Sequence, residues 1–161
     1  MDIETFTTKH LGNLQVSYGL NNDGLSWDDF CQSAYNQYLE THTIKVAVYG
    51  TLKQGGQLNG AMGGLDPVKF HRLPGFRMLN LGWYPGIVPA EGKSVFVEVY
   101  DITEEILSRL DGVEGAFPEA PESGLYRRET VKIDNDDVFI YIWNGKEEGY
   151  EEIENGFFEV N

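Results

Sequence analysis

Lys45-Val46-Ala47-Val48-Tyr49-Gly50-Thr51-Leu52-Lys53 carries the strongest structural signal in the chain. Two β-branched valines flank a small apolar alanine, which predicts a buried β-strand. The pattern breaks at Tyr49-Gly50, where glycine lets the backbone turn and lets a ligand approach the main chain. The backbone N–H groups of Thr51 and Leu52 follow the strand and are not used in its hydrogen bonds. Successive N–H groups at a sharp turn attract anions and carbonyl oxygens. Spacing alone favours a tight turn after a core strand, and a binding loop is the alternative.

Three further stretches follow this strand and turn along the chain, and together the four stretches resemble a known family. Tyr49-Gly50-Thr51-Leu52 after an apolar strand resembles the signature of the gamma-glutamylcyclotransferase-like family, which includes the gamma-glutamylamine cyclotransferases. Leu110-Asp111-Gly112-Val113-Glu114-Gly115 is similar to the family's second signature at a helix end. Tyr84-Pro85 matches a Tyr-Pro pair that recurs in the family, and Tyr126-Arg127-Arg128 matches its Tyr-x-Arg pattern at the start of a strand. The resemblance covers roughly 44–143.

The resemblance implies a set of site residues and a reaction. Glu114 matches the family's catalytic acid/base, and the expected substrate-binding residues are Tyr49, Gly50, Thr51, Leu52, Tyr84 and Tyr126. The implied substrate is a small γ-glutamyl compound, whose α-amine attacks its own γ-carbonyl and releases 5-oxoproline and a free amine. Because nucleophile and electrophile share one molecule, the protein has mainly to fold the substrate and move a proton. No cofactor and no metal are expected, and the three histidines lack metal-ligand spacing.

Two stretches depart from the family pattern. After Lys53 the chain is small and polar, and the helix expected near Leu58 is weakened by Gly60, Gly63 and Gly64. In the strand Ser94 to Tyr100 the family often has Gly then Glu, so Val97 departs and Glu98 matches. A carboxylate is seldom buried without a partner. The strand pattern leaves open whether Glu98 is buried or lies on a partly exposed face.

Composition narrows the classes of protein and of partner. The 161 residues are 41% hydrophobic and carry a formal charge of −14, which predicts one globular domain that repels nucleic acid and anionic membranes. The single Cys31 cannot form an internal disulfide and suits a reducing compartment. No apolar run approaches the roughly 20 residues that span a bilayer. We therefore expect a cytoplasmic protein with no membrane and no nucleic-acid partner.

The first 43 residues lie outside the resemblance. Leu14, Val16 and Tyr18 alternate as in a short strand, and 21–24 is typical of a turn. Ser26 can cap a helix that begins at Trp27 and continues to about Leu39 with an aromatic stripe at helical spacing. Packing of that stripe on the domain is the first interpretation, and a protein partner bound through residues 1–43 is the second.

The remaining periodicities predict strands with few helices. Strands are expected at 68–73, 76–81, 94–100, 130–133 and 138–143, with the first two and the last two paired as hairpins, the latter through a turn at 135–137. A helix is expected over about 103–110, with Thr103 or Asp101 as its cap and Gly112 well placed to end it. The pattern supports an α/β or α+β fold, and the family resemblance adds a small mixed β-barrel with flanking helices.

We divide the chain into an N-terminal extension with one helix (1–43), a gamma-glutamylcyclotransferase-like domain (44–145) and an acidic tail (146–161). The tail carries six acidic residues and one lysine and is expected to be solvated, although Ile153 and Phe158 are among the residues that could dock part of it.

Three hypotheses follow for the function. The first is a γ-glutamyl-amine or γ-glutamyl-peptide cyclotransferase with Glu114 as general acid/base. The second is a ligand-binding or regulatory protein that keeps the fold without turnover, because fold similarity does not guarantee activity. The third is an acidic decoy that binds a basic protein through its charge, with residues 1–43 as the partner surface.

Overall fold

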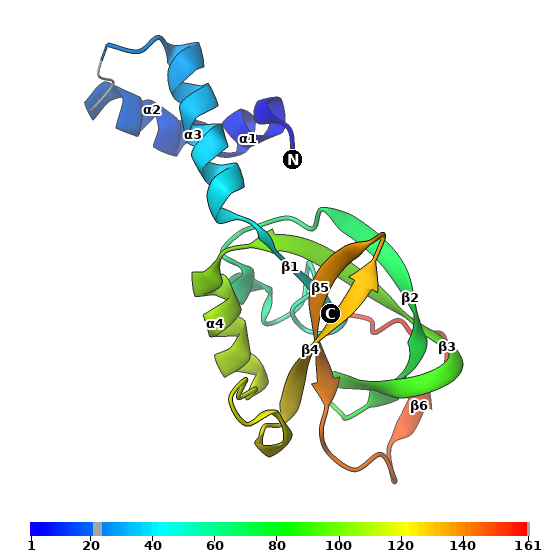
Figure 1. Ribbon diagram of the computed structural model, residues 1–161. Coiled ribbons are helices and arrows are strands. Elements are labelled where there is room, and N and C mark those ends of the chain that lie inside the picture. The colour runs from blue at the N-terminus through cyan, green and yellow to red at the C-terminus, as the bar shows by residue number, and fades with distance from the viewer. Residues whose placement is uncertain (21–23, 161) are drawn as a thin grey trace. The chain divides into compact units, whose positions relative to one another are not determined.

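A computed structural model describes residues 1–20 and 24–160 in two compact units, Met1–Thr43 and Ile44–Asn161 (Figure 1). Each unit has its own buried cluster of apolar side chains. Most of the turn expected at 21–24 lies outside the described residues. Among the helices that the structure describes, none is long and apolar enough to cross a bilayer.

The first unit consists of three helices, where the sequence predicted one. They are α1 (Ile3–Lys9), α2 (Leu11–Leu20) and α3 (Trp27–Thr41). The start of α3 is confirmed, because the Ser26 hydroxyl accepts the N–H of Asp29 at 3.2 Å. The buried centre consists of Phe6, Leu14 and Cys31, one from each helix.

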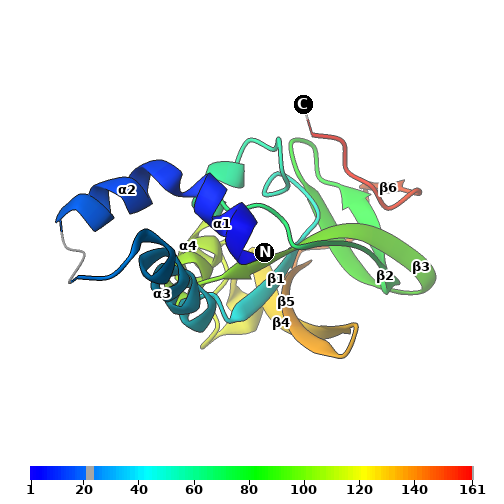
Figure 2. The same cartoon turned by 90° about the horizontal axis from the view of Figure 1, so that it is seen from above.

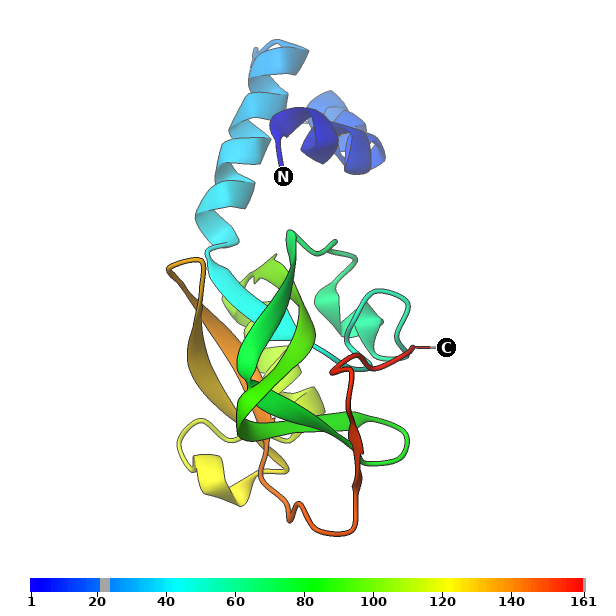
Figure 3. The same ribbon diagram turned by 90° about the vertical axis from the view of Figure 1, so that its right-hand side faces the viewer.

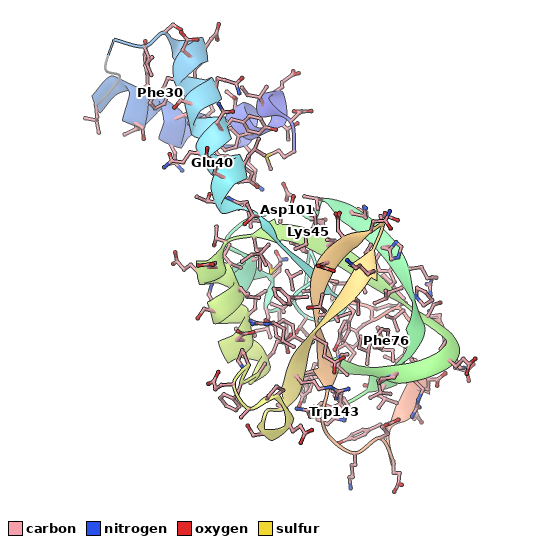
Figure 4. All side chains as sticks on the ribbon, in the orientation of Figure 1. Phe30, Glu40, Lys45, Phe76, Asp101 and Trp143 are labelled. Atoms are coloured by element: carbon pink, nitrogen blue, oxygen red, sulfur yellow. The ribbon has the colours of Figure 1, made fainter. Side chains whose placement is uncertain are left out.

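The short strand predicted around Leu14 is wrong, because this segment belongs to α2. Residues that alternate over five positions also include an i, i+4 pair, which lies on one face of a helix. Leu14 is buried, and the Tyr18 ring packs edge-on against Phe30 of α3, which Figure 4 labels. Val16, the residue between them, is exposed. The same three residues therefore fit both periods, and packing against α3 selects the helix.

The second unit is built on one six-stranded mixed sheet in the order β4-β5-β1-β3-β2-β6. Its strands are β1 (Ile44–Val48), β2 (Lys69–Asn80), β3 (Pro85–Ile102), β4 (Tyr126–Ile133), β5 (Asp136–Trp143) and β6 (Glu151–Ile153). The β1–β5 pair is parallel and the other pairs are antiparallel. The sheet curls strongly but its edge strands β4 and β6 do not pair, so the predicted barrel is an open one (Figure 1).

The predicted strand Lys45–Val48 lies at the centre of this sheet. β1 pairs with β3 on one side and β5 on the other, and Val46 and Ala47 are fully buried. At the partly exposed start of β1 the Lys45 ammonium pairs with the Asp101 carboxylate of β3 at 2.6 Å. Figure 4 labels both residues. Because β1 is held on both sides, the turn that follows it starts from a fixed point.

Strand β2 corrects one prediction. The segments 68–73 and 76–81 do not form a hairpin with each other but belong to one strand, interrupted by a shift of register between Pro74 and Phe76. Gly75 has a positive φ of 91° at this irregularity, which a glycine adopts without strain. Both halves pair with the long strand β3, which runs between β1 and β2 (Figure 2). The connection between β2 and β3 is a tight turn that contains Trp83.

The β4–β5 hairpin is confirmed, although its turn comes earlier than predicted. Asp134 and Asn135 occupy it with positive φ values of 50° and 70°. These two residue types tolerate the left-handed conformation best among non-glycine residues.

Helix α4 (Glu104–Glu114) is the helix of the second unit. The Thr103 hydroxyl caps it as predicted, by accepting the N–H of Ile106 at 3.2 Å. The helix runs past Gly112, where its end was expected, and finishes at Gly115 with a positive φ of 59°. The prediction chose the wrong glycine, because only Gly115 takes the left-handed cap conformation. Glu114 is therefore the last helical residue.

The C-terminal segment docks further than the predicted solvated tail. β6 pairs with the end of β2, and Ile153 and Phe158 pack against the core of the sheet. Figure 3 shows this segment, in red, running along the sheet to the C-terminus. The N–H of Phe96 donates to the Gly156 carbonyl at 2.8 Å, so the docking continues beyond β6.

Candidate active site

A cavity of about 240 Å³ lies in the second unit, at the end of β1. All seven residues predicted from the sequence for the site line it, although their roles are still a prediction. The lining consists of Ala47, Val48, Tyr49, Gly50, Thr51, Leu52, Gln57, Leu58, Trp83, Tyr84, Pro85, Val113, Glu114, Leu125, Tyr126 and Tyr141. The turn after β1 and the end of α4, more than 60 residues apart in sequence, thus meet at one hollow.

The turn after β1 presents three unused main-chain donors. The N–H groups of Gly50, Thr51 and Leu52 donate to no acceptor within the described part of the chain. The backbone folds tightly here, since the N–H of Lys53 donates to the Gly50 carbonyl at 3.0 Å. Consecutive free N–H groups in a concave turn attract an anion or a carbonyl oxygen.

Gly50 is required by a close approach rather than by its φ. A Cβ atom at this position would lie 2.7 Å from the Cδ and Cγ atoms of Pro85. Real Cβ atoms do not approach carbon this closely, so the absence of a side chain lets the turn pack against the start of β3. Tyr84-Pro85 therefore forms the cavity wall that faces residues 50–52, which we call the donor turn.

Glu98 of β3 fixes the residues after the turn through a hydrogen bond. Its side chain is only 6% exposed, and Oε1 accepts the N–H of Gln54 at 2.8 Å and the hydroxyl of Tyr100 at 3.0 Å. The Asn59 amide adds a second hold by donating to the Leu52 carbonyl at 2.9 Å. A buried carboxylate is stable only with such partners, so Glu98 is a supporting residue that does not line the cavity.

Glu114 presents an unpaired carboxyl group to the cavity. Within the described residues no hydrogen bond or ion pair reaches it. Burial raises the pKa of Glu114 from 4.5 to about 7, because the low-polarity walls disfavour the charged form. A carboxyl group with this pKa exchanges protons readily near neutral pH.

The hydroxyl groups of two predicted substrate-binding tyrosines donate hydrogen bonds to backbone carbonyls. The Tyr49 hydroxyl donates to the Tyr141 carbonyl and the Tyr126 hydroxyl to the Pro85 carbonyl, each at 2.7 Å. Burial raises the pKa of both phenols, and the nearby charge of Glu114 raises it further. These rings therefore form fixed, uncharged walls of the cavity.

A polar network beside Glu114 was not predicted from the sequence. The Asp111 carboxylate accepts the Tyr141 hydroxyl at 2.7 Å and the Arg128 guanidinium at 2.5 Å. Tyr141 itself lines the cavity. Tyr141 belongs to no motif and has the alternation of an ordinary strand. Asp111 and Arg128 both stand in stretches that match the family, so their positions could have pointed to the network.

The residues that the structure describes contain no cluster of three or more histidine, cysteine or carboxylate side chains placed to hold a metal ion. The cavity offers free N–H donors, aromatic walls and one carboxyl group.

Comparison with protein families gives this arrangement its context. Residues 46–159 match the family model described as "Gamma-glutamyl cyclotransferase, AIG2-like". This chain belongs to that family. In the gamma-glutamyl cyclotransferase family model, the matched range includes both signatures and every residue that lines the cavity.

Individual relatives agree with the family assignment. Protein PH0828 of Pyrococcus horikoshii, provisionally named a gamma-glutamylcyclotransferase, is 28% identical over 117 residues, which are 73% of this chain and 92% of the relative. Its crystal structure matches with a TM-score of 0.59 over 71% of this chain and 89% of that chain. The solution NMR structure of protein ytfP from Escherichia coli matches with a TM-score of 0.55 and 27% identity, over 71% of this chain and 95% of that chain.

A mouse AIG2-like protein has the same fold. Its crystal structure gives a TM-score of 0.52 at 24% identity, over 66% of this chain and 82% of that chain. At this identity the match supports a common fold alone.

Proposed function

We propose that this chain is a γ-glutamyl-amine or γ-glutamyl-peptide cyclotransferase in which Glu114 is the general acid/base. The observation that carries the proposal is the convergence of the free N–H groups of 50–52 and the Glu114 carboxyl group on one cavity. Family membership supports γ-glutamylcyclotransferase-like activity, and the geometry supports the roles of the individual residues.

The proposed reaction starts with proton removal. The Glu114 carboxylate takes a proton from the α-ammonium of the substrate, and the freed amine attacks the γ-carbonyl carbon of the same molecule. A carbon–nitrogen bond forms and closes a five-membered ring. The oxygen becomes negatively charged in the tetrahedral intermediate, where main-chain N–H groups of the donor turn stabilise it or hold the substrate carboxylate.

Collapse of the intermediate breaks the original amide bond. Glu114 returns its proton to the departing nitrogen, and the ring nitrogen gives up a second proton that also ends on the departing amine. The α-ammonium had three protons and the lactam nitrogen keeps one, so the two others leave with the amine as its ammonium form. No water is consumed and no covalent bond to the protein is formed.

The cavity walls favour a compact substrate. Tyr49, Tyr126 and Pro85 enclose the space beside Glu114, and a folded γ-glutamyl group brings its amine close to its γ-carbonyl. Holding the amine and the γ-carbonyl in such a near-attack arrangement lowers the entropic part of the barrier.

The test is turnover of a panel of γ-glutamyl compounds, with 5-oxoproline measured by mass spectrometry. We expect product with the wild-type chain and a loss of about 100-fold or more in kcat with Glu114→Gln, the range that general acid–base groups supply. Full turnover by Glu114→Gln would remove Glu114 from the mechanism. Tight binding without product over hours would instead favour a ligand-binding protein of the same fold.

A further inference from the structure

We infer that the departing amine of the preferred substrate is aromatic and carries no carboxylate. This inference rests on the proposed function and concerns the part of the cavity where the leaving group must lie. It is carried by the apolar rim of the cavity, by the hydrogen-bonded turn that carries Trp83 and by the distribution of charge around the opening.

The rim of the cavity exposes apolar side chains. Leu58, Trp83, Tyr84, Val113 and Leu125 all line the cavity and are all exposed to solvent. They come from four separate segments, so their common placement is not a consequence of one apolar stretch. Contiguous exposed apolar surface at the mouth of a cavity marks a site where a ligand covers it.

Trp83 is the most exposed member of this rim. Its side chain is 85% exposed, more than any other large apolar residue of the described chain. The other two tryptophans, Trp27 and Trp143, both pack against aromatic rings. An indole left in water beside a cavity offers a flat surface on which a second ring can stack.

The turn that carries Trp83 is held in place by hydrogen bonds. The N–H of Leu81 donates to the Tyr84 carbonyl at 3.0 Å, and the N–H of Gly82 donates to Asn80 Oδ1 at 2.9 Å. Gly82 has a φ of 110°, which other residues adopt only with strain. The Tyr126 hydroxyl fixes the following Pro85 carbonyl. The backbone position of Trp83 is therefore set before a ligand arrives, which lowers the entropic cost of bringing the indole to the ligand.

No lysine, arginine or histidine is among the described residues that line this cavity. Glu114 is the only charged side chain among the described residues that line the cavity. The two arginines that follow Tyr126 are committed elsewhere, Arg127 to Glu129 and Arg128 to Asp111. The chain as a whole has a formal charge of −14. A leaving amine with a carboxylate, such as an amino acid, would lose hydration here without gaining a counter-ion.

Four γ-glutamyl amides test the two properties separately. γ-Glutamyl-phenethylamine and γ-glutamyl-phenylalanine differ by one carboxylate, and so do γ-glutamyl-ethylamine and γ-glutamyl-alanine. Within each pair we expect kcat/KM to be about tenfold higher without the carboxylate. We expect the phenethylamide to exceed the ethylamide by about 3- to 10-fold, the gain that one stacked ring supplies.

Variants at the rim locate the effect. Trp83→Ala should lower the phenethylamide-to-ethylamide ratio toward one, and Trp83→Phe should keep most of it. Phe70→Ala is the matched control, because Phe70 is an exposed aromatic residue that does not line the cavity. Its ratio should equal that of the wild type. A ratio unchanged by Trp83→Ala would overturn the assignment of Trp83.

The outcomes separate this inference from the proposed function. Equal kcat/KM for all four amides, or faster turnover of those with a carboxylate, would overturn the inference while the cyclotransferase activity stands. No 5-oxoproline from any amide would overturn the proposed function. Calorimetric titration of the four amides into Glu114→Gln then gives a readout without turnover, in which the same order of affinity is expected and equal affinities would overturn the inference.

Discussion

The Tyr141 hydroxyl donates a 2.7 Å hydrogen bond to Oδ1 of Asp111 and thereby joins strand β5 to the last turn of α4. The other oxygen of Asp111 pairs with Arg128 of β4. Asp111 precedes Glu114 by three residues and so lies on the same side of the helix. Two strands therefore hold, through one carboxylate, the helical turn that places the Glu114 carboxyl group in the cavity.

Removal of the Asp111 carboxylate is expected to lower the stability of the fold. Asp111→Ala leaves the Arg128 guanidinium and the Tyr141 hydroxyl without an acceptor, so we predict a loss of about 3 kcal/mol in the free energy of unfolding. Urea denaturation measures it. Asp137→Ala is the control, since Asp137 pairs with Lys132 in an exposed ion pair and should lose less than about 1 kcal/mol. Equal losses in the two variants would show that the Asp111 network is not a structural tie.

The rate of cyclisation should depend on pH through Glu114. In the proposed mechanism Glu114 acts first as a base, so only its ionised form starts the reaction. Burial raises the pKa of Glu114 to about 7. We predict that kcat/KM falls tenfold per pH unit below about pH 7 and levels off above it, until the substrate amine titrates. A limb near pH 4.5, the ordinary value for a glutamate, would contradict the predicted burial effect.

The same raised pKa predicts a stability change of opposite sense. The folded state holds the Glu114 proton up to about pH 7, whereas the unfolded chain releases it near pH 4.5. The folded state thus binds more protons in this window, and the contribution of Glu114 to stability is full below pH 4.5 and lost as pH rises through 7. Glu114→Gln, which stays neutral, should unfold at higher urea than wild type at pH 8, by up to about 3 kcal/mol.

The matched measurement at low pH separates this effect from a change in packing. At pH 4.5 and below, Glu114 and glutamine are both neutral in the folded state, so the difference in the free energy of unfolding should be small. A difference that is the same at pH 4.5 and pH 8 would contradict the linkage.

The sequence predicted local features where one residue type is needed for a physical reason. The strand before Gly50, the Ser26 and Thr103 caps and the β4–β5 hairpin are confirmed because each depends on neighbours in sequence. The end of α4 was misplaced because two glycines were available and tertiary packing chose Gly115. The helix α2 was missed because its three apolar residues fit two periods.

The site could be predicted only where a motif marked it. The seven expected residues line one cavity, yet Tyr141 lines it as well and belongs to no motif in the sequence. The burial of Glu98 likewise depends on the Gln54 N–H, 44 residues earlier in the chain. Such long-range pairings follow from the strand order, which alternating residues do not specify.

Gly50 should tolerate no side chain. In Gly50→Ala the new Cβ would lie 2.7 Å from Pro85, so the donor turn must move away from the start of β3. We predict a kcat/KM at least about tenfold lower, because a shift of a few tenths of an ångström misplaces the N–H donors. Gly60→Ala is the control, since a Cβ there meets nothing within 4 Å. Comparable activity in both variants would argue that the turn has room to adapt.

The C-terminal segment should brace the donor turn through Lys53. The Lys53 side chain is only 2% exposed, its ammonium donates to the Phe158 carbonyl at 2.6 Å, and it lies 3.8 Å from the centre of the Phe157 ring. Lys53 directly follows the three free donors of the turn. Burial lowers the pKa of this lysine, and the charge of Glu98 opposes that shift.

Deletion of 157–161 removes both partners of the Lys53 ammonium at once. We predict faster amide hydrogen exchange at Lys53 and Gln54, whose N–H groups donate to the Gly50 carbonyl and to Glu98. We also predict a KM for γ-glutamyl substrates raised by about 3- to 10-fold, because a loosened turn binds the substrate less well. The turnover number should change less, since Glu114 belongs to helix α4, which is not part of the deleted segment. Glu159→Ala, an exposed change within the same segment, should leave both quantities as in the wild type. If the truncated chain kept the exchange rates and KM of the full chain, the C-terminal segment would be a cover of the sheet edge without influence on the turn.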